Sequence, residues 1–290
     1  MPQDAPSATL ERAVSLLSAE PIFVLTGAGM STDSGIPDYR GPDSVPRTPI
    51  TYSTFLRDES ARAHYWARSY VGWASFGTAA PNDGHLALAE LQERQQLTGV
   101  VTQNVDGLHQ RAGTKDVIDL HGRLDRVRCL NCENYFDRHE VSRWLGQANP
   151  SFAARLPELQ RDAQSAPDGD AEVDKTDEFV VVACPICGGI LKPDVVFFGE
   201  QVPRERVDAC YRQVEAAAAV LVLGSSLTVM SGLRFVRHAA RRQLPIVIVN
   251  RGKTRADDIA MAQPAMRLHL DSGVSEFLRD YLKLLVTSRS

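Results

Sequence analysis

The chain has 290 residues, of which 43% are hydrophobic and 23% are charged, and its formal net charge is −4. These values are ordinary for a soluble globular protein and allow one large domain, or one large and one small domain. The negative net charge argues against binding to nucleic acid or to an anionic membrane, and no apolar run reaches the roughly 18 residues that span a bilayer. Residues 1–8 resemble neither a secretory signal nor a transit peptide, so we expect a cytoplasmic protein.

The first predicted elements are a helix over residues 9–19 and a strand over residues 22–25, followed by a glycine-rich loop. The strand is uniformly apolar, as is typical of a parallel strand covered on both faces. Because glycine lacks a side chain and tolerates positive φ, Gly27 and Gly29 would let the backbone approach a phosphate closely. The position three after Gly29 is Thr32, so the match to the dinucleotide-binding fingerprint is imperfect.

Further apolar runs predict an α/β fold with a parallel sheet. We expect strands over residues 99–102, 117–120, 220–223 and 246–249, and helices over residues 53–73, 85–95 and 233–242, the last of them basic. Pro42, Pro46 and Pro49 predict a mobile loop over residues 41–51. Open parallel sheets bind ligands at the carboxyl ends of their strands, so a cofactor is expected there.

Polar side chains follow the second and third of these strands. Gln103, Asn104 and Asp106 either bind an amide and a ribose or complete an Asx-type turn. His121 ends the third strand, and a pKa near neutrality would let it act as a general base. A lone histidine is more often a core or capping residue, so the residues alone leave its role open.

The last two predicted strands also end in small or polar residues. The strand over residues 220–223 runs into Gly224, Ser225 and Ser226, and the strand over residues 246–249 runs into Asn250, Arg251 and Gly252. One such edge would be an ordinary loop. Several together are what an extended dinucleotide requires.

Four of the five cysteines form two Cys-x-x-Cys pairs, namely Cys129 with Cys132 and Cys184 with Cys187. A two-residue spacer lets both sulfurs of a pair bind one ion, so the sequence predicts one structural zinc ion with four cysteine ligands. With all four positions filled, the zinc has no open site for catalysis. Cys210 is expected to be a buried apolar residue in a helix.

The linker between the two cysteine pairs spans residues 133–183 and is longer than the usual length of about 15–20 residues. Within it, residues 158–178 carry eight acidic and two basic side chains. This composition predicts a long exposed insertion.

Taken in order, these motifs resemble those of the sirtuin family of NAD-dependent protein deacylases. The matching stretches are residues 27–31, 35–40, 102–109, 121–122, the two cysteine pairs, 191–200 and 224–227, which together extend over roughly residues 10–278. Met30 and Tyr39 replace a usual Ile and a usual Phe of similar size. The long cysteine linker and residues 65–73 look like the class II branch, whose eukaryotic members are mitochondrial.

The resemblance implies a fold and a set of NAD-binding residues. Residues 1–122 and 192–290 would form a Rossmann-like, doubly wound parallel sheet, and residues 123–191 a smaller zinc-ribbon module, with a further helical part of the small domain near residues 41–80. The residues implied to bind NAD are Gly27, Ala28, Gly29 and Ser31 at the pyrophosphate, Ile36, Asp38, Tyr39, Arg40, Gln103, Asn104 and Asp106 at the nicotinamide and its ribose, and Gly224, Ser225, Ser226, Asn250, Arg251, Gly252 and Val274 toward the adenosine.

The resemblance also implies the reaction. The acyl oxygen of an acyl-lysine would attack the ribose carbon of NAD as nicotinamide leaves, and His121 would act as the general base on a ribose hydroxyl. The products would be free lysine, nicotinamide and an acylated ADP-ribose. The protein substrate would lie between the two domains as an added strand, and the chain would act as a monomer.

The resemblance further implies the substrate-binding residues Tyr65, Arg68, Val195, Phe197, Phe198 and Gly199. Tyr65 and Arg68 are three residues apart and would share a helix face, where a hydroxyl and a cation could bind the carboxylate of succinyl- or glutaryl-lysine. Alternatively, Tyr65 packs in the core and Arg68 lies at the surface. The surrounding sequence is similar to the lipoamidase-like subgroup, so acetyl, lipoyl and branched acyl groups are further candidates.

Three other functions fit parts of the pattern. An NAD-dependent mono-ADP-ribosyltransferase would release nicotinamide without an acyl-lysine peptide, and a dehydrogenase would change NADH absorbance. A zinc-ribbon module that only binds a partner would need no NAD, and the acidic charge disfavours nucleic acid as that partner.

Overall fold

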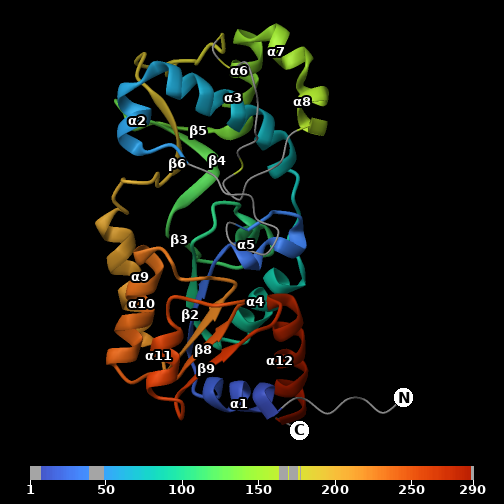
Figure 1. Cartoon of the computed structure of the whole chain (residues 1–290), viewed down its shortest axis with the longest axis vertical. Helices are drawn as coiled ribbons and strands as arrows, with labels where there is room; N and C mark the ends of the chain where they lie inside the picture. Colours follow the sequence, from blue (N-terminus) through green and yellow to red (C-terminus); the bar gives the residue numbers. More distant parts are fainter. Residues whose placement is uncertain (1–7, 39–48, 163–168, 170–175, 177, 289–290) are drawn as a thin grey trace.

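Two β-sheets organise the protein. The computed structural model describes residues 8–38, 49–162, 169, 176 and 178–288 of the chain. A six-stranded sheet has the strand order β3-β2-β1-β7-β8-β9, and a three-stranded sheet has the order β5-β4-β6. The large sheet lies in the lower half of the view in Figure 1, and the small sheet lies in the upper half.

All the strands of the large sheet are parallel. They are β1 (Ile22–Thr26), β2 (Leu97–Thr102), β3 (Ile118–Asp119), β7 (Ala219–Leu223), β8 (Ile246–Val249) and β9 (Arg267–Leu270). Every residue of β1, β7 and β8 is buried, as their uniformly apolar sequences predict. The expected strands are confirmed, and β9 is an additional strand at the edge of the sheet. Its sequence, with Arg267 and His269, is too polar to predict a buried strand.

Helices cover both faces of this sheet, which confirms the doubly wound Rossmann-like arrangement. α1 (Ala8–Leu17), α4 (Asp83–Glu93) and α12 (Val274–Ser288) form one apolar layer with the sheet. α9 (Arg204–Ala216) and α10 (Met230–Arg241) form the other, together with Ala256 and with Ile259 of α11 (Asp257–Ala262). Cys210 is fully buried in α9, as expected. Within the described ranges, no helix is both long enough and apolar enough to cross a membrane.

The small sheet carries its own helical layer. It consists of β4 (Gly122–Cys129), β5 (Tyr135–Asp137) and β6 (Leu191–Val195), all antiparallel, and packs with α2 (Tyr52–Arg57), α3 (Glu59–Phe76), α6 (Arg138–Ala148) and α7 (Pro150–Ala154). α8 (Leu156–Asp162) packs against Val71 of α3. The buried guanidinium of Arg138 lies over the rings of Trp66 and Trp73, at 5.2 and 5.4 Å from their centroids, and joins α6 to α3.

The single helix predicted over residues 53–73 is wrong, because the chain breaks at Asp58. This residue has an extended backbone, with φ −113° and ψ 112°, and its carboxylate accepts a hydrogen bond of 2.9 Å from the N–H of Ala61. Asp58 therefore caps α3 and ends α2.

The exposed insertion predicted over residues 158–178 is also wrong at two positions. Gly169 is buried and lies so close to Leu124 that a Cβ on it would be 2.7 Å from that side chain. Thr176 is buried and shares a hydrogen bond of 2.7 Å with His64. Residues 163–168, 170–175 and 177, and most of the loop predicted over residues 41–51, lie outside the described residues.

Candidate active site and metal centre

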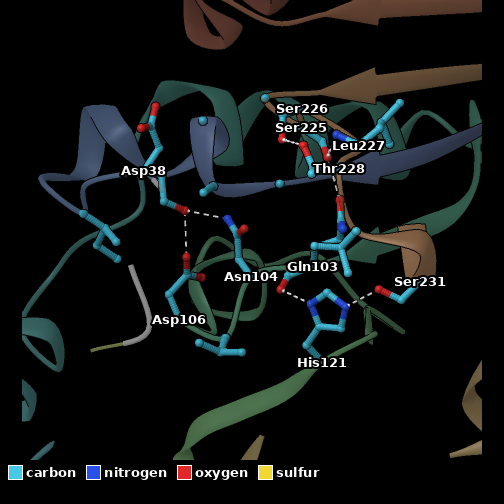
Figure 2. Close-up of a pocket in the computed structure, with 18 of the residues that line it drawn as sticks. Asp38, Gln103, Asn104, Asp106, His121, Ser225, Ser226, Leu227, Thr228 and Ser231 are labelled. Carbon is cyan, nitrogen blue, oxygen red and sulfur yellow. Dashed lines mark hydrogen bonds between the residues drawn. The ribbon is translucent and has the colours of Figure 1, made fainter. Parts of the chain in front are cut away.

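A cavity of about 1000 Å³ opens at the carboxyl ends of β1, β2, β7 and β8. This volume is at the upper end of the range for small-molecule sites, which is about 300–1,000 Å³. Tyr65 of α3 and the segment after β6 of the small sheet contribute to its wall. Most of the predicted residues meet here: Gly27, Ala28, Gly29, Ser31, Ile36, Asp38, Tyr65, Gln103, Asn104, Asp106, His121, Val195, Phe197, Phe198, Gly199, Gly224, Ser225, Ser226, Asn250, Arg251, Gly252 and Val274. Figure 2 shows how the polar members of this set face one another.

Three of the predicted residues are not placed at the cavity. Tyr39 and Arg40 lie outside the described residues. Arg68 is described and half-buried on α3, but it is not part of the cavity wall formed by the described residues, whereas Tyr65 is. The predicted Tyr65–Arg68 pair therefore does not face the cavity as a unit in this structure.

The glycines of the first loop have a different role from the one expected from their conformational freedom. Gly27 has φ −134°, and positive φ among the described glycines of these loops occurs instead at Gly35, Gly224 and Gly252. A Cβ on Gly27 would lie 2.7 Å from the carbonyl oxygen of Gly224, and a Cβ on Gly224 would lie 2.4 Å from the nitrogen of Met30. The glycines are required because the loops after β1 and β7 pack backbone against backbone.

A hydrogen-bonded network follows β2. The side-chain amide of Asn104 donates to the hydroxyl of Ser31 at 3.0 Å, and this hydroxyl donates to the carboxylate of Asp106 at 2.7 Å. Asp106 also accepts a bond of 2.9 Å from the N–H of Leu108. Burial raises the pKa of the Asp106 carboxyl, and these donors lower it. The network fixes the three side chains at the cavity wall.

His121 is held at both ring nitrogens (Figure 2). Its Nδ1 lies 2.9 Å from the carbonyl oxygen of Gln103, and its Nε2 lies 2.7 Å from the hydroxyl of Ser231. Because a carbonyl only accepts, Nδ1 carries the proton, and Nε2 keeps its lone pair in the neutral ring. Burial lowers the pKa of His121, the Gln103 carbonyl opposes this, and the positive charges of Arg206 and Arg234 lower it further. The ring is therefore neutral at physiological pH and able to take up a proton at Nε2.

An ion pair supports the apolar part of the wall. The ammonium of Lys192 lies 3.1 Å from the Glu200 carboxylate and 4.7 Å from the centroid of the Phe197 ring. The same carboxylate accepts a hydrogen bond of 2.8 Å from the N–H of Phe197. Phe197 packs at a centroid distance of 5.1 Å against Tyr65, so the wall is continuous with the apolar core beside the small sheet.

The residues of the cavity fit a bound NAD. Because the loops after β1 and β7 pack closely, Gly27 and Gly29 place no side chain over the turn after β1. At this turn the Ala28 N–H makes no hydrogen bond within the described part of the chain. An amide at such a turn suits a phosphate oxygen. Ser31, Asn104 and Asp106 offer partners for a ribose or a carboxamide, and Ser226 and Asn250 also line the cavity.

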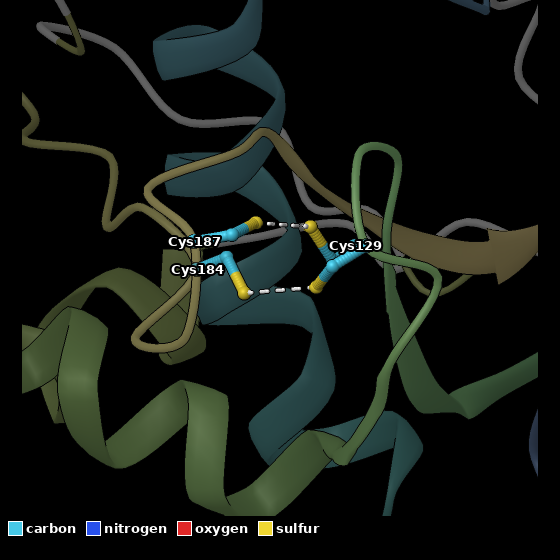
Figure 3. A group of neighbouring side chains, drawn as sticks. Cys129, Cys184 and Cys187 are labelled. Carbon is cyan, nitrogen blue, oxygen red and sulfur yellow. Dashed lines mark hydrogen bonds between the residues drawn. The ribbon is translucent and has the colours of Figure 1, made fainter.

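Four cysteines form the candidate metal centre (Figure 3). The sulfur of Cys129 lies 3.5 Å from that of Cys187, and the sulfur of Cys132 lies 3.7 Å from that of Cys184. All four sulfurs lie within 4.8 Å of one another. A disulfide requires about 2.05 Å. A zinc tetrahedron with bonds of about 2.3 Å places its sulfurs about 3.8 Å apart.

The surroundings of the cysteines match this ligand set. The N–H of Asn131 points at the sulfur of Cys129 at 3.4 Å, as suits a thiolate. A Cβ on Gly189 would lie 3.0 Å from Cys129 Sγ and 3.2 Å from Cys187 Sγ. The four cysteines therefore fit one zinc ion with a structural role, as predicted.

Sequence reasoning missed part of the cavity wall. Ser231 and Arg234 line it from α10, and Thr228 and Val229 from the loop before that helix. α10 begins at Met230, three residues before the predicted start, so Ser231 fell outside the helix. The sequence gives no signal that Ser231 lies at the cavity, because its partner His121 is 110 positions away.

Comparison with known proteins places the chain in a family. The model of the "Sir2 family" matches residues 27–231. An NAD-dependent protein deacetylase from Xanthomonas campestris pv. campestris (strain 8004) is 56% identical over 243 residues, covering 82% of this chain and 80% of that relative.

Solved structures agree with this match. A structure of Sir2 with a p53 peptide and NAD+ superposes with a TM-score of 0.74 at 30% identity, covering 96% of this chain and 99% of the other. A structure of Sir2 with the inhibitor EX-527, 2'-O-acetyl-ADP-ribose and deacetylated p53 peptide has a TM-score of 0.71 at 30% identity, covering 95% of this chain and 99% of the other.

Proposed function

Because this chain belongs to the Sir2 family, we propose that it is an NAD-dependent protein-lysine deacetylase that transfers the acyl group to ADP-ribose and releases nicotinamide. The observation that carries the proposal is the neutral His121, with its basic Nε2 at a cavity whose wall fits NAD. The relatives named above supply the reaction, and the residues of this chain supply a site that suits it.

In this reaction bound NAD supplies the ribose carbon that loses nicotinamide and receives the acyl oxygen. Gly27, Ala28 and Ser31 would hold the pyrophosphate, and Asn104 and Asp106 would hold the nicotinamide end. His121 takes a proton from a ribose hydroxyl at Nε2, while Gln103 keeps the opposite side of the ring in place. A zinc ion held by the four cysteines would stabilise the region around the small sheet and, with all four positions filled, would take no part in the chemistry.

The wall of the cavity supports apolar acyl groups over acidic ones. Ile50, Tyr65, Val195 and Phe197 line it, and Arg68 is not among the described residues of this wall. A carboxylate buried against these apolar side chains would lose its hydration, and the nearby ammonium of Lys192 is already paired with Glu200. We therefore propose acetyl and longer apolar acyl groups as substrates, and the class II branch as the closest affiliation within the family.

Location and assembly follow as further parts of the proposal. The negative net charge supports a cytoplasmic enzyme that does not act on nucleic acid or at a membrane. Acyl-lysine proteins are the proposed substrates, and a monomer is the proposed state of assembly.

The test is a panel of acetyl-, succinyl- and lipoyl-lysine peptides incubated with NAD, with products identified by mass spectrometry. We expect peptide-dependent nicotinamide and acylated ADP-ribose, with little turnover of the succinyl peptide. His121→Ala should keep the fold and NAD binding but lose deacetylation. An active His121→Ala enzyme would overturn the role of the base. Nicotinamide release without a peptide would favour ADP-ribosyl transfer, and formation of NADH would favour a dehydrogenase.

A further inference from the structure

The basic nitrogen of His121 forms a hydrogen bond with Ser231, which lies outside the motifs that predict the site. Ser231 is the second residue of α10, is 8% exposed, and places its hydroxyl oxygen 2.7 Å from His121 Nε2. It lines the same cavity as His121. Its hydroxyl is thus the protein group that faces the atom assigned to proton transfer (Figure 2).

The direction of this hydrogen bond follows from the other side of the ring. Nδ1 must donate to the Gln103 carbonyl, so the neutral ring has only a lone pair at Nε2. The Ser231 hydroxyl therefore donates to Nε2. The two bonds, from opposite sides, restrict rotation of the ring and fix which nitrogen is basic.

Ser231 is itself held in place by the packing of its helix. The next residue, Gly232, lies against the side chain of Gln103, where a Cβ would be 2.7 Å from Nε2 of that amide. The Oε1 of the same amide accepts a hydrogen bond of 2.6 Å from Ser225. The start of α10 therefore packs against the side chain of Gln103, and the backbone carbonyl of the same residue accepts the hydrogen bond from His121 Nδ1.

We propose that Ser231 is a positioning residue for His121, which orients the imidazole and presents Nε2 to the ribose hydroxyl; this rests on the proposed deacetylase function. The hydroxyl of Ser231 holds the lone pair of Nε2 toward the cavity until the substrate hydroxyl donates there in its place. The residue accelerates the proton-transfer step and contributes little to binding of NAD or peptide.

The test separates the step that needs the base from the step that precedes it. Deacetylation requires His121, whereas peptide-dependent exchange of labelled nicotinamide into NAD reports loss of nicotinamide before the base acts. Ser231→Ala should lower kcat for deacetylation about 5-fold, the effect of one neutral hydrogen bond. Its KM values for NAD and peptide, and its exchange rate, should stay within about twofold of wild type.

Two further variants complete the experiment. Ser231→Thr keeps the hydroxyl and should recover most of kcat, and Ser18→Ala removes an exposed serine hydroxyl on the far side of the protein and should change nothing. An unchanged kcat in Ser231→Ala, an equal loss of exchange and deacetylation, or a Ser231→Thr enzyme with full exchange but no recovery would each overturn the proposal. A wild-type protein with neither activity would instead refute the proposed function.

Discussion

Two buried histidines next to the first glycine loop should make the protein sensitive to mild acid. His85 and His109 are 0% and 1% exposed, and their ring centroids lie 4.8 Å apart. His85 also shares a hydrogen bond of 3.0 Å with the side chain of Asn82, which donates in turn to the carbonyl of Met30 at 2.9 Å. A charge on His85 would therefore be buried between α4 and the loop after β1.

The magnitude follows from the pKa of His85, which burial lowers to about 4 from an ordinary value of 6.5. As the pH falls below 6.5, the unfolded chain binds a proton at this position and the folded chain does not. Stability that is fully present above pH 6.5 is thus lost progressively down to the folded pKa. At about 1.4 kcal/mol per pKa unit, the loss is about 2 kcal/mol at pH 5 and about 3 kcal/mol near pH 4.

Other groups titrate in the same range, so the measurement must be a difference. Burial raises the pKa of Asp119 to about 6 from an ordinary value of 3.8. The folded state binds this proton first, so Asp119 opposes the loss of stability as the pH falls through 6. Burial also lowers the pKa of His109, which adds to the effect of His85.

The assay is urea unfolding of wild type and His85→Gln at several pH values between 7.5 and 5. Glutamine retains a polar group for Asn82 and does not titrate. We expect the variant to be less stable than wild type at pH 7.5, and the gap to shrink by about 2 kcal/mol by pH 5. A gap that stays constant across this range would refute the reasoning, because it would show that His85 does not carry the acid sensitivity.

Two more predictions concern the metal centre and the loop contact. Metal analysis should find one zinc per chain, and Cys184→Ser should lose both this zinc and thermal stability. Cys210→Ala should retain the zinc, because that thiol is buried in α9. Zinc retained by Cys184→Ser would contradict the assignment. Gly224→Ala should weaken NAD binding at least tenfold, since its Cβ would lie 2.4 Å from the nitrogen of Met30. Gly113→Ala is the control: Gly113 has φ +98° and no atom within 4 Å of its Cβ, so this variant should show only the backbone strain of about 1 kcal/mol. Equal NAD affinity in the two variants, by calorimetry, would exclude the packing explanation.

The parts of the fold that the sequence predicts are those whose residues experience one uniform environment. β1, β7 and β8 are buried on both faces, so their apolar runs identify them directly. The two cysteine pairs are also predicted from local sequence, because the two-residue spacer within each pair lets both of its sulfurs bind one ion. β4 gives no such signal, because a register shift between Arg123 and Val127 breaks the two-residue alternation, so that the buried Leu124 and Val127 are three residues apart.

Features that depend on a single side-chain contact are harder to predict. The break at Asp58 depends on one side chain accepting from Ala61 within an otherwise helical sequence. The contact of Ser231 with His121 joins residues that are 110 positions apart, and it depends on the close approach of α10 to Gln103. No local pattern contains that information.

The position of His121 explains why a base and a glycine are adjacent in this chain. His121 follows β3, at the edge of the large sheet, and Gly122 begins β4 of the small sheet. Gly122 has φ +83°, and a Cβ on it would lie 1.9 Å from the carbonyl oxygen of Asp194, so only glycine allows β6 to cross here. The carbonyl of His121 accepts a hydrogen bond of 2.8 Å from the N–H of Val196, which lines the cavity between Val195 and Phe197. The base is thus tied to Gln103 of the large sheet through its ring and to the small sheet through its backbone. A change in the angle between the sheets would move the base relative to the cavity, so the accuracy of proton transfer depends on the packing of both.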